Sequence, residues 1–80
     1  MKNGRMDDGI DTTRREELDR LESHLQSQFH GRVRNLRLLQ SGDGIVLHGV
    51  AHSYYAKQLA QHALMQATMR EIAANQIEVI

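Results

Sequence analysis

IVLHGVAHSYYAK, residues 45–57, is the stretch of the sequence that decides the fold. Its first seven residues are mostly apolar and end before a polar pair, which is typical of a short strand, although Gly49 lies inside it. Ser53 follows, and serine is one of the residues that best cap the start of a helix. The stretch therefore predicts a strand that leads, within two residues, into a helix.

A second strand is expected immediately before this stretch. Leu36 and Leu38 alternate with Arg37, as in a strand that buries one face. The sequence SGDG at residues 41–44 then favours a tight turn, because glycine and aspartate tolerate the backbone angles that such a turn needs. We therefore expect a β-hairpin over residues 33–51.

An amphipathic helix is predicted before the hairpin, at about residues 13–30. Thr13 and Glu16 fit a capping box at its start, and Gly31 is well placed to end it. Apolar residues recur at steps of three and four, which places them on one helical face. These residues are Leu18, Leu21, Leu25 and Phe29.

The second helix is expected at about residues 54–69, with a buried face that is rich in alanine. We expect Tyr55 to pack at the edge of the core. Gly49 would leave room for the close approach of this helix or for a β-bulge. Residues 69–74 fit either a last helical turn or a connector, whereas the alternating residues 75–80 predict a closing strand.

These elements predict an α+β fold in the order α-β-β-α-β. A three-stranded sheet with both helices on one face is the simplest way to bury two amphipathic helices. Residues 12–80 would form this single domain. Residues 1–11 are polar, charged and contain glycine, and they predict a disordered N-terminal tail.

The composition excludes several classes of protein. Ten basic and ten acidic residues balance, whereas a dedicated nucleic-acid binder is expected to be basic. The absence of cysteine excludes disulfides and thiol chemistry. No apolar run approaches the ~20 residues of a membrane-spanning helix, and no secretion signal begins the chain. As written, the chain is expected in the cytoplasm, and in the periplasm or envelope only if the natural chain is longer.

From about Leu18 to Val79 the chain resembles the BON domain, named for bacterial osmotically inducible Y and nodulation proteins. Residues 45–49 fit the family's apolar-x-Leu-x-Gly strand, and residues 53–60 fit its Ser-x-x-x-Lys-x-x-Ala helix start. The ending NQIEV fits Asn-x-Ile-x-Val. The family usually has a Gly-Val pair before the last strand, and residues 69–74 depart from that pattern.

The resemblance implies a non-catalytic module that associates with phospholipid membranes or mediates contacts between envelope proteins. It implies no catalytic residues and no cofactor. The sequence itself contains no recognisable nucleophile–base pair, paired carboxylates or phosphate-binding loop, so we do not expect an enzyme. The five histidines have no metal-ligand spacing, so we expect no metal site.

Two groups of residues are candidates for contacts with an anionic lipid or a protein partner. Tyr54 and Lys57 open the second helix, where a ring and an ammonium group suit the headgroup layer of a membrane. The alternative interpretation is that Tyr54 and Lys57 are ordinary surface residues that bind nothing. Val46, His48 and Val50 would face away from the helices, and a partner or a second copy of the chain could cover them. The alternative interpretation is that these three are scattered surface residues, which need no partner.

Two alternatives to the BON-like binding module stay open: a homo-oligomerising structural domain and a small KH-like nucleic-acid binder. The KH arrangement needs a Gly-x-x-Gly loop between two helices, whereas residues 42–44 lie in a hairpin. Arg32, Arg34 and Arg37 make the first strand basic, and phosphate would suit such a cluster. By parity, Arg32 and Arg34 share one face and Arg37 takes the other.

Overall fold

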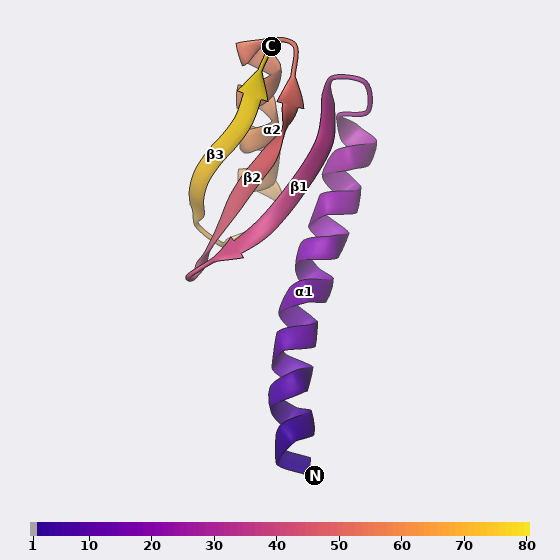
Figure 1. Ribbon diagram of the computed structural model, residues 1–80, viewed down its shortest axis with the longest axis vertical. Helices are drawn as coiled ribbons and strands as arrows, with labels where there is room; N and C mark the ends of the chain where they lie inside the picture. Colours follow the sequence, from indigo (N-terminus) through magenta and orange to yellow (C-terminus); the bar gives the residue numbers. More distant parts are fainter. Residues whose placement is uncertain (1) are drawn as a thin grey trace.

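The computed structural model describes the backbone of residues 2–80 and the side chains of residues 14–80. The elements follow in the predicted order α-β-β-α-β, so the α+β fold is confirmed (Figure 1). They are α1 (Lys2–Gln28), β1 (Val33–Ser41), β2 (Gly44–Ala51), α2 (Tyr54–Ala67) and β3 (Ile72–Val79).

The sheet has the order β1-β2-β3, with β2 in the centre. β1 and β2 pair antiparallel, which confirms the hairpin over residues 33–51. Ser41 pairs with Gly44, so the loop has two residues, and Gly42 has the positive φ of 60° that the first position of a type II′ turn needs. β3 runs parallel to β2 because α2 returns the chain between them.

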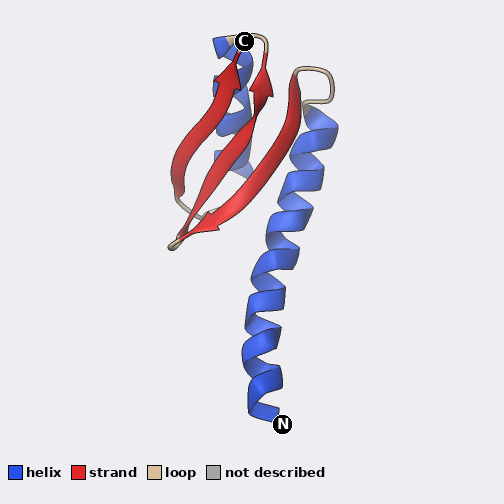
Figure 2. Cartoon of the chain, in the orientation of Figure 1, coloured by secondary structure: helices blue, strands red, loops and turns tan. Residues whose placement is uncertain are grey.

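One core joins both helices to the same face of the sheet. Leu25 of α1 and Leu64 of α2 are fully buried in it, together with Leu47 of the central strand. Figure 2 shows α2 behind the sheet and α1 alongside β1. The other buried members are Leu18, Phe29, Val33, Leu36, Leu38, Ile45, Ala51, Ala56, Ala60 and Ile77. Two of these alanines, Ala56 and Ala60, lie on the buried side of α2, where their small side chains let its backbone come close to its neighbours.

The bounds of α1 differ from the prediction. The helix begins at Lys2, so the capping box at Thr13 does not start it. Adding residues to an existing helix costs far less free energy than nucleating a new one. This accounts for the extension of α1 toward its N-terminus, beyond the turns that pack on the sheet. α1 thus enters the segment predicted as a tail. The side chains of residues 1–13 lie outside the described ones, so the division into residues 1–11 and 12–80 stays a prediction.

Gly31 shapes the connection from α1 to β1, as predicted for the end of the helix. α1 ends at Gln28, and Gly31 has a φ of 87°. The amides of Arg32 and Val33 both donate to the carbonyl of Phe29, at 2.9 and 3.1 Å. The left-handed glycine therefore lets the chain reverse into β1 within one tight turn.

The stretch after α2 is a connector followed by strand. α2 ends at Ala67, two residues before the expected Met69. β3 starts at Ile72, earlier than the predicted residue 75, because its pairing with β2 begins where the amide of Ile45 donates to the carbonyl of Glu71 at 2.9 Å. The ambiguous residues 69–74 are therefore divided between connector and strand.

Polar side chains of α1 cover the outer edge of β1. Glu22 Oε1 accepts a hydrogen bond from the amide of Leu38 at 2.9 Å, and Gln26 Nε2 donates to the carbonyl of Leu36 at 3.0 Å. An edge strand with unpaired backbone groups invites pairing with other chains. Along this part of β1, α1 therefore supplies the partners that a further strand would otherwise provide.

Gly49 faces a β-bulge in β1. The register shifts between Arg34 and Arg37, and Asn35 within the bulge has a φ of 56°. A Cβ on Gly49 would lie 3.0 Å from Val33 Cγ1 and 3.2 Å from the carbonyl oxygen of Arg34. The bulge explanation is confirmed, and the expectation that α2 makes the close approach is wrong.

Candidate functional site

The predicted contact residues lie in two separate places. Tyr54 and Lys57 belong to the first turn of α2, whereas Val46, His48 and Val50 lie along β2. A third place, the cleft between α1 and β1, was not predicted. The geometry of each place decides what it can bind.

Ser53 fixes the start of α2, as predicted. Its backbone is extended, with a φ of −150°, and its Oγ accepts a hydrogen bond from the amide of Ala56 at 3.1 Å. Tyr54 and Tyr55 are therefore the first helical residues, and their side chains are 65% and 70% exposed. Both rings are presented to solvent at one end of the domain.

The expectation that Tyr55 packs at the edge of the core is wrong. The buried side of α2 consists of Ala56, Ala60 and Leu64, spaced four residues apart. Successive residues of a helix point about 100° apart, since it has 3.6 residues per turn, so Tyr55 is rotated out of that stripe. Tyr54 lies on the surface, and Lys57 is half-buried.

An open hollow of about 460 Å³ lies beside the ring of Tyr55. The hollow lies between the α1–β1 connection and the start of α2, and Figure 1 shows both at the same end of the molecule. None of the lining residues is acidic; they are Gly31, Arg32, His52, Ser53, Tyr55, Ala56 and Leu59. We call Arg32, His52, Tyr54, Tyr55 and Lys57 the tyrosine end.

Val46, His48 and Val50 face away from the helices, as predicted, since Ile45, Leu47 and Ala51 on the opposite face are fully buried. All three outward side chains are nevertheless half-buried. The uncovered apolar surface of the sheet is therefore smaller than the sequence suggests.

Charged residues interrupt this open face. Val50 pairs with Arg34 on one side and Glu78 on the other, and His48 pairs with Arg37. Arg34 and Arg37 therefore share the open face, and the parity argument that separated them is wrong because the bulge lies between them. At the other end of the face Val46 pairs with Leu39, which is 47% exposed.

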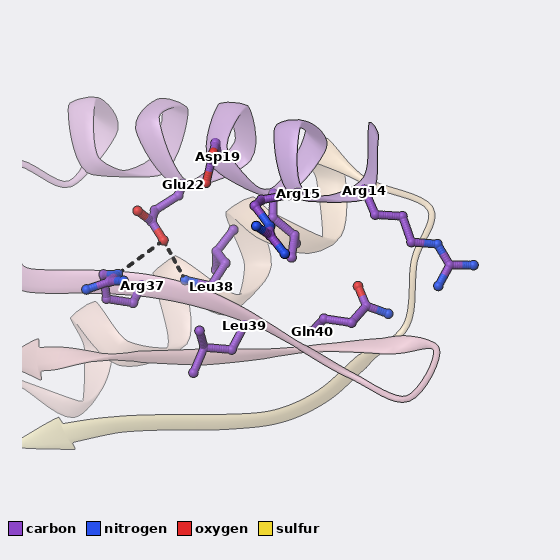
Figure 3. A pocket seen from close by; sticks show the side chains of 9 residues that line it. Arg14, Arg15, Asp19, Glu22, Arg37, Leu38, Leu39 and Gln40 are labelled. Atoms are coloured by element: carbon purple, nitrogen blue, oxygen red, sulfur yellow. Dashed lines mark hydrogen bonds and ion pairs between the residues drawn. The ribbon is translucent and has the colours of Figure 1, made fainter. Parts of the chain in front are cut away.

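The cleft between α1 and β1 gathers arginines from distant parts of the chain (Figure 3). Arg37 Nε lies 3.6 Å from Glu22 Oε1, so this ion pair joins its two walls. The lining residues are Arg14, Arg15, Leu18, Asp19, Glu22, Arg37, Leu38, Leu39 and Gln40. The adjacent Arg14 and Arg15 are visible in the sequence, but nothing there indicates that they border a cleft with β1.

Two further tests concern metal ions and membranes. Across the part of the chain that the structure describes, no three histidine, aspartate or glutamate side chains gather closely enough to hold a metal ion. In the same part, no helix combines the length and the apolar character that a bilayer span requires.

Comparison of the chain with models of protein families, with curated proteins and with solved structures finds no match.

Proposed function

We propose that the chain is a non-catalytic, BON-like binding module that docks onto an anionic phospholipid surface through the tyrosine end. One observation carries this proposal: two tyrosines, 65% and 70% exposed, stand at one end of the domain, where Tyr55 shares a hollow with Arg32 and Tyr54 shares the first turn of α2 with Lys57. The BON resemblance of residues 18–79 supports it independently of the geometry.

The chemistry of the tyrosine end suits the headgroup layer of a membrane. A tyrosine ring has an apolar body and a polar hydroxyl, so it is stable where hydrocarbon meets water. Arg32 and Lys57 would each gain about 1 kcal/mol near an anionic leaflet. Because the whole chain has no net charge, this attraction is local and falls off within a Debye length of about 8–10 Å.

The shape of the molecule also favours this orientation. Its longest extent is 49 Å against 21 and 20 Å in the other directions, and Figure 1 shows that α1 projects from the end opposite to the start of α2. A flat surface can therefore approach the tyrosine end without meeting the projecting N-terminal part of α1.

The open sheet face supports the protein-partner alternative less well. Val46 and Val50 are half-buried and only Leu39 is exposed, while the charged Arg34, Arg37 and Glu78 lie on the same face. A partner or a second copy would therefore have to match these charges while covering a small apolar area. We accordingly place the primary contact at the tyrosine end rather than on Val46, His48 and Val50.

The double variant Tyr54→Ser/Tyr55→Ser is expected to lose about tenfold in affinity for vesicles rich in phosphatidylglycerol. It removes both rings, and about 1.4 kcal/mol corresponds to a factor of ten. Co-sedimentation across a series of lipid concentrations measures the effect. The wild-type protein should bind neutral phosphatidylcholine vesicles far less, and added salt should weaken its binding to the anionic ones.

Met65→Ser/Met69→Ser is the matched control for this experiment. These methionines are 57% and 103% exposed, and they lie at the far end of α2 and just beyond it. The control should bind like the wild type. Equal binding of neutral and anionic vesicles, or an equal loss in the methionine variant, would contradict the proposed docking end.

A further inference from the structure

The cleft between α1 and β1 opens where the two elements separate. Glu22 and Gln26 hold α1 against Leu36 and Leu38 of β1. Among the described residues, no hydrogen bond of α1 reaches the backbone of β1 beyond Leu38. The space that results is about 430 Å³, within the range of about 300–1,000 Å³ that small-molecule sites occupy.

Cations outnumber free anions in this cleft. It contains three arginines and two carboxylates, but Glu22 already accepts from the amide of Leu38 and pairs with Arg37. Among the described side chains, Arg14 and Arg15 form no ion pair. In Figure 3 the guanidinium of Arg15 points into the gap toward β1, while that of Arg14 lies further out, beyond it.

The β1 side of the cleft is held in place and partly apolar. Arg70 Nη1 donates to Gln40 Oε1 at 3.0 Å and lies 3.8 Å from Glu17 Oε1, so it ties β1 to α1 beside the cleft. Leu38 is buried at the base, whereas Leu39 is 47% exposed. A charged group and an exposed apolar side chain therefore border the same space.

We infer that this cleft binds a small amphipathic anion, with its carboxylate or phosphate monoester on Arg15 and its apolar part against Leu39. Guanidinium groups bind both kinds of head through charge-assisted hydrogen bonds. Asp19 lies on the same wall, so a ligand with a single anionic head fits better than a polyanion. The cleft shares no residue with the tyrosine end, so the binding of a small anion here is separate from the docking function.

Amide chemical shifts of the ¹⁵N-labelled full chain test this inference, with octanoate and phenyl phosphate as the two probes. We expect saturable shifts in residues 14–22 and 37–40. Arg15→Gln should raise Kd about tenfold or more, because the anionic head loses a charge-assisted hydrogen bond. Arg15 is exposed on α1, so the variant should fold, and Arg15→Lys should bind better than Arg15→Gln.

Arg20→Gln is the matched control, since it removes an exposed arginine of α1 that lines neither the cleft nor the tyrosine end, and it should leave Kd unchanged. Octanol, which has the same chain length without the charge, should bind at least tenfold more weakly than octanoate. The difference between octanoate and phenyl phosphate tells which anionic head the cleft prefers. Absence of saturable shifts with both probes, shifts confined to other residues, or equal binding of octanol would overturn the inference.

Discussion

Leu47→Ala is expected to lower the free energy of unfolding by about 2–5 kcal/mol. Leu47 is fully buried on the central strand, where it pairs with Leu38 on one side and Asn75 on the other. Truncation would leave a cavity that β1, β3 and α2 could fill only by moving together. The whole free energy of unfolding of a small domain is about 5–15 kcal/mol, so the variant would lose much of its stability. Urea unfolding followed by circular dichroism measures the change.

Val46→Ala is the matched control for this prediction. Val46 precedes Leu47 on the same strand, faces the other side of the sheet and is only half-buried. The variant should lower the free energy of unfolding by about 1 kcal/mol, because fewer contacts are removed. If the two variants lost the same stability, the assignment of the buried and open faces of β2 would be wrong.

Gly49→Ala is expected to lower the free energy of unfolding by about 1–3 kcal/mol, which is the second large effect that we predict. The new Cβ would lie 3.0 Å from Val33 Cγ1 and 3.2 Å from the carbonyl oxygen of Arg34, which is backbone and cannot easily move. The φ of 156° at Gly49 is also one that residues with a side chain rarely adopt. The same urea titration measures the loss.

A double-mutant cycle with Val33→Ala separates the two contacts at Gly49. Removing Cγ1 of Val33 relieves one neighbour and leaves the backbone oxygen, so the double variant should be more stable than the sum of the single losses predicts. A Gly49→Ala protein as stable as the wild type would show that the β-bulge does not press against β2.

Much of the fold could be predicted because its signals are local. The turn at Gly42 depends on neighbouring residues, and so does the cap at Ser53. The buried face of β2 follows from alternation along a single strand. Each signal has a periodicity or a backbone requirement that is visible within about ten residues.

The prediction failed where one extra residue or one helical step changed the direction of a side chain. Strand parity assumes a regular ladder, and the bulge between Arg34 and Arg37 broke it. At the start of α2, the helical period is compatible with a buried position for both Tyr55 and Ala56, but in the structure Ala56 is buried and Tyr55 is exposed.

The cleft could not be predicted, because it depends on contacts between residues far apart in the chain. Arg15 and Leu39 are 24 positions apart, and they border one space only because Glu22 and Gln26 hold α1 along β1. No local pattern indicates that α1 covers the strand edge. The sequence shows two adjacent arginines on a helix, which are ordinarily solvated.

The intrinsic fluorescence of the tyrosines tests the proposed docking end most directly. Tyr54 and Tyr55 are the two tyrosines of the chain, which contains no tryptophan, so the emission reports on this end alone. Phosphatidylglycerol that carries bromine on its acyl chains quenches a fluorophore that reaches the interface. We predict strong quenching with these vesicles, little with brominated phosphatidylcholine, and recovery in high salt. Unquenched emission from protein that co-sediments with the anionic vesicles would contradict the account, because another surface would then make the contact.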